Sequence, residues 1–306
     1  MRNAFVAGLL ELAADDDRIV LLTGDLGFTV LEPFAEAYPD RFFNAGVAEQ
    51  NMVGMATGLA EAGFTPFVYS IATFASMRPY EFIRNGPALH HLPVRVVGIG
   101  GGTDYGHNGV THYALEDVGL MRLQPELTTV VCADREQTRT ALRALKNYER
   151  PVYLRLGRGG TPVDGLDGRF TLGAAETIGD GTDALIVALG PLAAAALGAA
   201  ALLERDGVGV TVAVVSSFNP SPDAQLAELI DRSRVALTVE GHYRTGGLGS
   251  YVAEVIADNG LGTPLSRIGI ESMPRGFSGD EGYLAEAFGL TPAAIAARTT
   301  TALQAR

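Results

Sequence analysis

Short apolar runs alternate with amphipathic stretches along most of this chain of 306 residues. Runs rich in β-branched residues predict buried strands, and longer segments with apolar positions three or four residues apart predict helices. The expected strands are Ile19–Thr23, Thr65–Val68, Val94–Gly98, Thr128–Cys132, Val152–Arg155, Ala184–Leu189, Val210–Val215 and Val235–Val239. The expected helices are Asn3–Ala14, Val47–Ala62, Arg78–His90, Arg135–Lys146, Leu192–Glu204, Pro222–Arg232 and Ser250–Asn259. This alternation predicts an α/β protein with two doubly wound domains.

A stretch rich in glycine and aspartate, residues 157–181, interrupts the pattern and is typical of a linker. We therefore expect a first domain at 1–165, a linker at 166–180 and a second domain at 181–306. Each domain is long enough to bury a core of its own.

Composition excludes several classes of protein. The net charge is −12, from 23 basic and 35 acidic residues, which argues against binding to nucleic acid or to an anionic membrane. The uncharged stretch Ala184–Leu203 has the length of a membrane span, but Gly190 and Pro191 divide it into a strand and a helix. The first residues lack the layout of a signal peptide, because Glu11 interrupts their apolar run. A cytoplasmic protein is expected, and its single cysteine, Cys132, is interpreted as a buried structural thiol.

The segment Phe43–Gly58 places one carboxylate, Glu49, among small and apolar residues at a predicted helix start. A buried carboxylate is costly without a partner or a purpose, and the alternative is a helix-start glutamate with a local partner. The segment resembles the glutamate-bearing part of the pyrimidine-binding domain in thiamine-diphosphate enzymes of the transketolase family. The resemblance implies that Glu49 hydrogen-bonds the aminopyrimidine and drives it to the imino tautomer that deprotonates the thiazolium carbon.

A second motif, Gly106–Arg122, presents His107 and His112 on a glycine-bounded loop. Two histidines five residues apart could be metal ligands, but no third ligand follows at helical spacing, so no metal site is expected. The segment resembles the transketolase loop whose histidine lies beside the reacting carbon of the substrate. That resemblance assigns His112 to proton transfer near neutral pH and leaves His107 as a substrate-binding candidate.

The segment Ile71–Tyr80 resembles the part of the family that lays aromatic rings against the pyrimidine. Phe74 is the expected ring, because an aromatic face stacks on the cofactor and excludes water. Ile71 and Met77 are expected as its neighbours, and Tyr80 is a further candidate, since the register allows a shift of one residue. An ordinary core phenylalanine is the alternative for Phe74.

Three charged residues extend the resemblance. Asp25 follows the first predicted strand, as the family's acidic loop does, and is expected near the cofactor as a structural or interface carboxylate. Arg2 and Arg158 match the family's two phosphate-binding arginines, although both could be ordinary surface charges.

Other positions depart from the family pattern. Asn108 replaces the aspartate that recognises a substrate hydroxyl, and Tyr113 follows the histidine where glutamine is usual. Gly100 takes the place of a phosphate-binding histidine. These departures predict a weaker grip on phosphate and altered recognition of the acceptor.

The diphosphate half of such a site is not apparent in the sequence. Gly179–Gly181 has the Gly-Asp-Gly pattern, but it precedes a strand, and the next asparagine, Asn219, lies too far along, so we interpret it as a turn. The chain therefore resembles the C-terminal subunit of a split transketolase. The resemblance implies thiamine diphosphate with Mg²⁺ held by a separate N-terminal subunit, and assembly as a dimer of heterodimers.

Several functions follow from the resemblance. The leading one is transfer of a two-carbon ketol unit from a ketose donor to an aldehyde acceptor. One alternative keeps the cofactor but uses an unusual acceptor, such as a modified sugar or a carrier-bound acyl group. A non-catalytic partner that stabilises a homologous enzyme is another, and the β subunit of a decarboxylating dehydrogenase is a less similar one.

Overall fold

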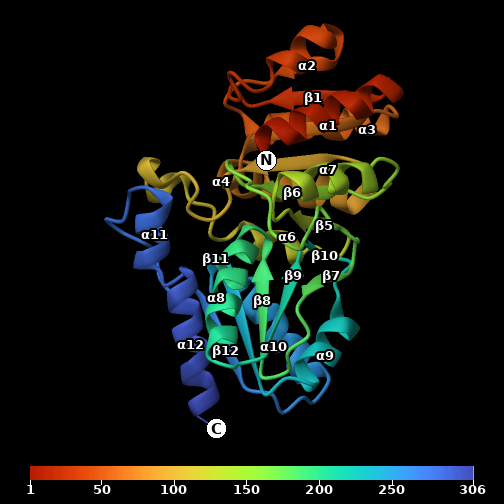
Figure 1. The fold of residues 1–306 in the computed structure, drawn as a ribbon. Helices are drawn as coiled ribbons and strands as arrows, with labels where there is room; N and C mark the ends of the chain where they lie inside the picture. Colours follow the sequence, from red (N-terminus) through yellow and green to blue (C-terminus); the bar gives the residue numbers. More distant parts are fainter. Residues whose placement is uncertain (306) are drawn as a thin grey trace.

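Two twisted sheets, one above the other in Figure 1, form the framework of the computed structural model, which describes residues 1–305. The upper sheet has seven strands in the order β10-β5-β6-β4-β3-β1-β2. Its strands are β1 (Ile19–Thr23), β2 (Phe42–Asn44), β3 (Thr65–Ile71), β4 (Arg95–Ile99), β5 (Thr128–Val131), β6 (Val152–Leu156) and β10 (Ser217–Phe218). All pairs are parallel except that of β10 with β5. Parallel strands need covered faces, and helices supply that cover on both sides.

The helices of the upper sheet pack in two groups. They are α1 (Arg2–Asp15), α2 (Glu32–Ala37), α3 (Glu49–Glu61), α4 (Ala72–Met77), α5 (Tyr80–Ile83), α6 (Asp117–Arg122) and α7 (Arg135–Ala144). One core cluster joins α1 and α7 to the sheet through residues such as Phe5, Leu9 and Leu142. The other cluster includes Met52 of α3 and Ile83 of α5. Short helical turns add η1 (Pro39–Arg41), η2 (Arg84–Ala88), η3 (Gly106–Asn108) and η4 (Val110–His112).

The lower sheet has five strands in the order β12-β11-β8-β9-β7. Its strands are β7 (Ala175–Ile178), β8 (Ala184–Leu189), β9 (Val210–Val215), β11 (Val235–Tyr243) and β12 (Leu265–Ile270). Its helices are α8 (Ala193–Arg205), which follows the turn η5 (Gly190–Leu192), α9 (Asp223–Asp231), α10 (Leu248–Asp258), α11 (Glu281–Ala287) and α12 (Pro292–Gln304). Alanines of α8 and Ile295 of α12 belong to one core cluster, and Leu226 of α9 and Val252 of α10 belong to another. The predicted α/β class with two doubly wound units is confirmed.

Two sequence predictions about elements are wrong in part. The helix expected at Arg78–His90 begins at Tyr80, as α5, and continues through the π-helical turn η2, where Pro87 lacks the N–H that a regular α-helix needs. The linker expected at 166–180 contains β7, which pairs with the lower sheet through the register Ala175↔Val215. Its few residues and half-exposed pattern left no periodic signal.

The uncharged stretch Ala184–Leu203 is the strand β8 followed by η5 and α8, as predicted. Among residues 1–305, no helix combines the length and the apolar character needed to cross a membrane. Cys132 is buried, as predicted, and burial raises the pKa of its thiol to about 12.

Candidate active site

Glu49 lies in the first turn of α3, and its side chain is only 2% exposed. Ser70, at the end of β3, donates its hydroxyl to Oε1 over 3.2 Å. Arg78, which follows α4, donates Nη1 to Oε2 over 2.8 Å. The arginine is 46% exposed, so it pairs with Glu49 from the solvent side. The predicted carboxylate is therefore buried but fully partnered.

The loop after β1 passes directly over this carboxylate. A Cβ at Gly24 would lie 3.7 Å from Oε1 of Glu49 and 3.8 Å from the hydroxyl of Ser70. The next residue, Asp25, is exposed and has a φ of +57°. Asn44 of β2 donates to its carboxylate over 2.9 Å and accepts its backbone N–H over 3.1 Å. Asp25 thus ties two loops together beside Glu49, which fits a structural carboxylate.

An aromatic ring lies on the far side of Arg78. The guanidinium stands over the ring of Phe74 at 4.1 Å from its centroid. The ring of His112 meets Phe74 edge-on, with centroids 5.3 Å apart. Phe74 is half-buried rather than a core residue, so Glu49, Arg78, Phe74 and His112 form one continuous group.

The other residues of this segment differ in exposure. Ile71 precedes α4 and is half-buried, whereas Met77 is 46% exposed and accepts a contact from the Thr73 hydroxyl at 3.4 Å. The hydroxyl of Tyr80 donates to the carbonyl of Leu120 over 2.9 Å and accepts from Gln124 over 2.6 Å. Tyr80 is therefore anchored in the packing of α5 on α6, away from the group around Glu49.

Residues 106–112, here named the histidine loop, lie beyond Phe74. His107 and Asn108 are exposed on η3, while His112 is half-buried on η4 with Nδ1 3.0 Å from the hydroxyl of Thr111. The ring of Tyr105 lies 6.1 Å from that of His112. The structure brings His112 to the aromatic group and leaves His107 and Asn108 at the surface.

The two arginines gather near Tyr105. Arg158 stands over the Tyr105 ring at 4.7 Å, and its backbone N–H donates to the Asp104 carboxylate over 2.9 Å. Burial raises the pKa of the Tyr105 hydroxyl, and the positive charges of Arg158 and Arg2 offset part of that rise. Arg2, half-buried at the start of α1, therefore lies on the same side as Arg158.

Sequence reasoning missed Ser70, Arg78 and Tyr105. Arg78 stands inside the segment matched to the family, but its contact with Glu49 spans 29 positions and carries no sequence signal. Tyr105 explains Gly100, which has a φ of +76° and whose Cβ would lie 2.2 Å from the Tyr105 ring. The tyrosine fills the space where a side chain at residue 100 would stand.

Tyr113 follows His112 in the sequence, but its side chain is buried and does not line the group around His112. It is 2% exposed, and its hydroxyl lies 2.9 Å from the carbonyl of Phe277 and 3.0 Å from that of Gly106. This position argues against the expectation that Tyr113 alters acceptor recognition by direct contact.

The Gly-Asp-Gly pattern at Gly179–Gly181 forms the turn between β7 and β8, as predicted. A Cβ at Gly181 would lie 2.1 Å from the backbone of Gly209, so the turn is packed against the chain that enters β9. Among residues 1–305, no three His, Cys, Asp or Glu side chains gather as a metal site would require.

Two family models cover most of the chain. The transketolase pyrimidine-binding domain matches residues 1–163, and the transketolase C-terminal domain matches residues 173–295. The chain belongs to the transketolase family. Within that family it corresponds to the C-terminal subunit of transketolases that are split into two chains.

Its relatives include separate subunits. A putative transketolase C-terminal section from Methanocaldococcus jannaschii is 38% identical over 97% of this chain and 94% of its own length. One subunit of the apulose-4-phosphate transketolase from Phocaeicola vulgatus is 36% identical over 88% of this chain and 86% of its own length. A solved structure described as a split gene transketolase, inactive beta4 tetramer, is 37% identical and superposes with a TM-score of 0.89, covering 99% of this chain and 98% of that one.

Proposed function

We propose that this chain is the pyrimidine-binding subunit of a thiamine-diphosphate-dependent transketolase. It transfers a two-carbon ketol unit from a ketose donor to an aldehyde acceptor, in an active site shared with a separate diphosphate-binding subunit that holds Mg²⁺. The observation that carries this proposal is the buried Glu49, which is held by Ser70 and Arg78 beside Phe74 and His112. A structural role alone does not require a buried carboxylate next to an accessible aromatic ring.

The residues present suit the pyrimidine half of the cofactor. When bound, thiamine diphosphate would supply the nucleophilic carbon that takes up and passes on the two-carbon unit. Glu49 would hold the ring nitrogen of the pyrimidine, and Phe74 would pack against the ring and keep water away. Arg78 is half-exposed, so its guanidinium can turn into solvent once the pyrimidine nitrogen replaces it as a partner of the buried Glu49.

His112 would move protons at the substrate oxygens. Its ring lies between Phe74 and Tyr105, with Nδ1 engaged by Thr111 and Nε2 left for a substrate hydroxyl. Imidazole is suited to this work because it can accept or donate a proton near neutral pH.

The substrate-binding residues would lie outward from His112. Arg2 and Arg158 would hold the anionic end of a sugar substrate, and His107 and Asn108 would contact its hydroxyls from the exposed face of the histidine loop. The guanidinium of Arg158 already donates to the backbone carbonyl of Asp104 over 3.3 Å and stands over the Tyr105 ring, so part of its binding capacity is occupied. This supports the second candidate function, ketol transfer to an unusual acceptor with a smaller demand for phosphate. A panel of phosphorylated and unphosphorylated aldehydes would separate the two by kcat/KM.

Exposed apolar side chains near Glu49 support a partner subunit. Phe28 and Val47 are each 71% exposed, and Phe43, Met55 and Met77 are also exposed. They lie on α3, on α4, on strand β2 and on the loops beside them, where a second chain would cover them. The inactive beta4 tetramer of a split relative supports the same requirement. The proposed assembly is a dimer of heterodimers in the cytoplasm.

Replacing Glu49 tests its proposed role in activating the cofactor. In the complex with the partner chain, Glu49→Gln should slow deuterium exchange at the reactive carbon of thiamine diphosphate by about 100-fold or more, because the carboxylate no longer activates the pyrimidine. Native mass spectrometry should show unchanged assembly. Glu61→Gln, at the exposed end of the same helix, is the matched control and should exchange at the normal rate. Normal exchange in Glu49→Gln would show that the assignment is wrong.

A further inference from the structure

Arg78 contacts both of the residues that are proposed to hold the pyrimidine. Its Nη1 donates to Oε2 of Glu49 over 2.8 Å, and its guanidinium carbon stands 4.1 Å from the centroid of the Phe74 ring. The other carboxylate oxygen of Glu49 accepts the hydroxyl of Ser70. The carboxylate and this face of the aromatic ring are therefore both occupied by side chains of the same chain.

A guanidinium resembles an aminopyrimidine in the properties that these two residues recognise. Both groups are flat, and both present N–H donors in the plane of their π system. A carboxylate binds the donors at the edge, and an aromatic ring packs against the face. Arg78 thus makes the two contacts that Glu49 and Phe74 would make with the cofactor.

Arg78 is held by few contacts and lies at the surface. Its side chain is 46% exposed, whereas that of Glu49 is 2% exposed. Its guanidinium makes no other hydrogen bond or ion pair with residues 1–305. An arginine in this position can move into solvent, but the buried carboxylate cannot follow it and needs another partner.

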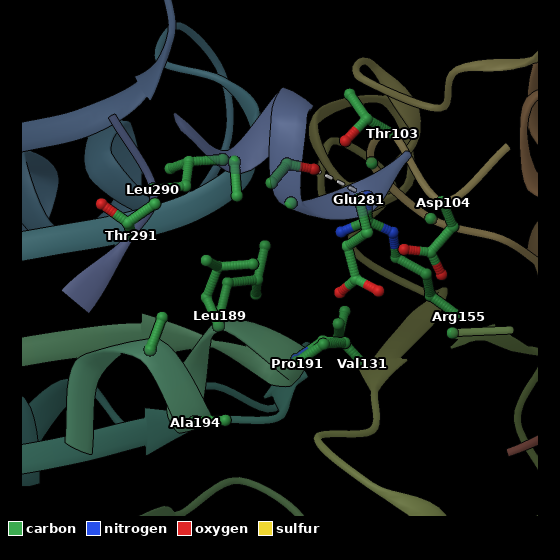
Figure 2. A pocket seen from close by; sticks show the side chains of 18 of the residues that line it. Thr103, Asp104, Val131, Arg155, Leu189, Pro191, Ala194, Glu281, Leu290 and Thr291 are labelled. Carbon is green, nitrogen blue, oxygen red and sulfur yellow. Dashed lines mark hydrogen bonds between the residues drawn. The ribbon is translucent and has the colours of Figure 1, made fainter. Parts of the chain in front are cut away.

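Arg155 shows that an arginine beside a buried carboxylate can also be fixed. Figure 2 shows Arg155 in the wall of the cavity between the two domains. It is 5% exposed and lies 3.0 Å from the buried carboxylate of Asp117. Its Nη2 also donates to the carbonyls of Ala114 and Gly241. Arg78 differs because one ion pair and one ring contact are all that hold its guanidinium.

We propose that Arg78 blocks the pyrimidine site by occupying the place of the cofactor's aminopyrimidine, and that cofactor binding displaces its guanidinium into solvent. The proposal rests on the proposed roles of Glu49 and Phe74 and adds a competing state to them. The cofactor binds only those molecules whose Arg78 has moved away, so its apparent affinity is lowered by that fraction. Removing the guanidinium should therefore tighten binding.

The pyrimidine ring alone tests this on the intact chain, without a partner subunit. The probe is 4-amino-2,5-dimethylpyrimidine, the ring of the cofactor without its diphosphate, and saturation-transfer NMR at pH 7 measures its binding. Arg78→Ala should bind the probe in the millimolar range, about tenfold more tightly than the wild type. Arg84→Ala removes an exposed arginine of η2 and is the matched control, which should bind as the wild type does. Adding Phe74→Ala to Arg78→Ala should abolish binding.

Arg78→Lys is the second variant, because Arg78→Ala leaves Ser70 as the only partner of the buried Glu49. Lysine keeps a cation for the carboxylate, so this variant should fold as the wild type does. Its ammonium is not flat and is more strongly hydrated, so it covers the Phe74 ring less well. The affinity of Arg78→Lys for the probe should lie between those of the wild type and Arg78→Ala. A wild-type affinity in either variant would overturn the proposal.

The assembled enzyme separates this proposal from the proposed function. Calorimetric titration of the complex with thiamine diphosphate and Mg²⁺ should give a Kd about tenfold lower for Arg78→Ala than for the wild type. No binding of the cofactor by the wild-type complex would overturn the proposed function and this proposal together. Binding with an equal or higher Kd in Arg78→Ala would overturn only the displacement of Arg78.

Discussion

Gly100 and Tyr105 share one small space near the histidine loop. The Cβ that any other residue would place at position 100 lies 2.2 Å from the Tyr105 ring, and the backbone there has a φ of +76°. A histidine at 100, which the family pattern would supply, is therefore incompatible with the tyrosine in its present position. Gly100 and Tyr105 are therefore structurally coupled, and Tyr105 also contacts His112 and Arg158.

This coupling gives a prediction about stability. Gly100→Ala should lower the free energy of unfolding by about 2 kcal/mol, because the new methyl group meets the Tyr105 ring and the backbone is strained. In a Tyr105→Ala background only the backbone strain remains, so the cost of Gly100→Ala should fall to about 1 kcal/mol. Urea unfolding of the two single variants and the double variant measures the difference. If the losses in stability of Gly100→Ala and Tyr105→Ala simply add in the double variant, the Tyr105 ring does not clash with a side chain at position 100.

Single residues mark what sequence can and cannot predict about the site. Glu49 was predictable because a carboxylate among small residues is unusual in its own segment. Arg78 was not, since its pairing with Glu49 depends on how α4 follows β3 and on where the two helices meet. Ser70 was missed for the same reason, since a serine at a strand end has many uses.

At the scale of elements, the histidine loop depends on a segment of the lower domain. The N–H of Gly279 donates to the carbonyl of Gly106 over 3.2 Å, and a Cβ at Gly106 would lie 2.1 Å from the Gly279 oxygen. The buried hydroxyl of Tyr113 reaches the carbonyls of Gly106 and Phe277. Figure 1 shows α11, which follows this segment, beside the loop. Contacts from Phe277 and Gly279 of the lower domain thus fix the position of the histidine loop.

Tyr113→Phe should loosen this attachment while preserving the packing of the ring. The hydroxyl carries one proton, which the carbonyls of Gly106 and Phe277 share, and removing it leaves the Phe277 carbonyl without this donor, so stability should fall by about 1 kcal/mol. Hydrogen exchange of residues 106–112 should become faster, measured by mass spectrometry. In the assembled enzyme kcat should fall several-fold.

Tyr243→Phe is the control for that change. Tyr243 packs in the same core cluster, and its hydroxyl makes no hydrogen bond within residues 1–305. Its removal should leave exchange in the histidine loop unchanged. Equal exchange in both variants would mean that the Tyr113 hydroxyl does not hold the loop.

The sequence predicted the fully buried strands well, but it did not predict the short or half-exposed strands at the edges of the sheets. β8 and β9 are buried at every position, so their composition alone predicted them. β12 is half-exposed over most of its length, and β10 has two residues whose strand form depends on pairing with β5. Pairing of that kind is decided by the whole fold.

For the whole molecule, the sequence predicted two domains but not how closely they are joined. β10 comes after the lower domain has begun, yet it completes the upper sheet. Arg155 donates across the junction to Gly241, and the N–H of Gly119 donates to Nε2 of His242 over 3.1 Å. Buried polar contacts between domains need partners on both sides, and sequence patterns within one domain do not reveal them.

Glu240 is the most unusual of these buried groups. It lies on β11, fully buried against the start of α10, where it accepts the backbone N–H groups of Leu248 and Gly249 over 2.7 and 2.8 Å. Burial nevertheless raises the pKa of its carboxyl to about 7, the two N–H groups offsetting only part of that effect. Burial lowers the pKa of the neighbouring His242. The junction therefore holds two groups whose pKa values burial shifts in opposite directions.

The pH dependence of stability should reveal Glu240. Between about pH 5 and 7 the folded chain keeps a proton on Glu240 that the unfolded chain has released, so this residue's contribution to stability falls as the pH rises through 7. His242 acts the other way, because its unfolded form binds protons below about pH 6.5 and its contribution grows as the pH rises. Glu240→Gln removes only the first effect. The free energy of unfolding of Glu240→Gln minus that of the wild type should therefore increase by about 2–3 kcal/mol from pH 5 to pH 8, measured by urea unfolding at each pH. The exposed Glu286→Gln should follow the wild-type curve, and a parallel curve for Glu240→Gln would mean that Glu240 is already ionised in the folded chain at pH 5.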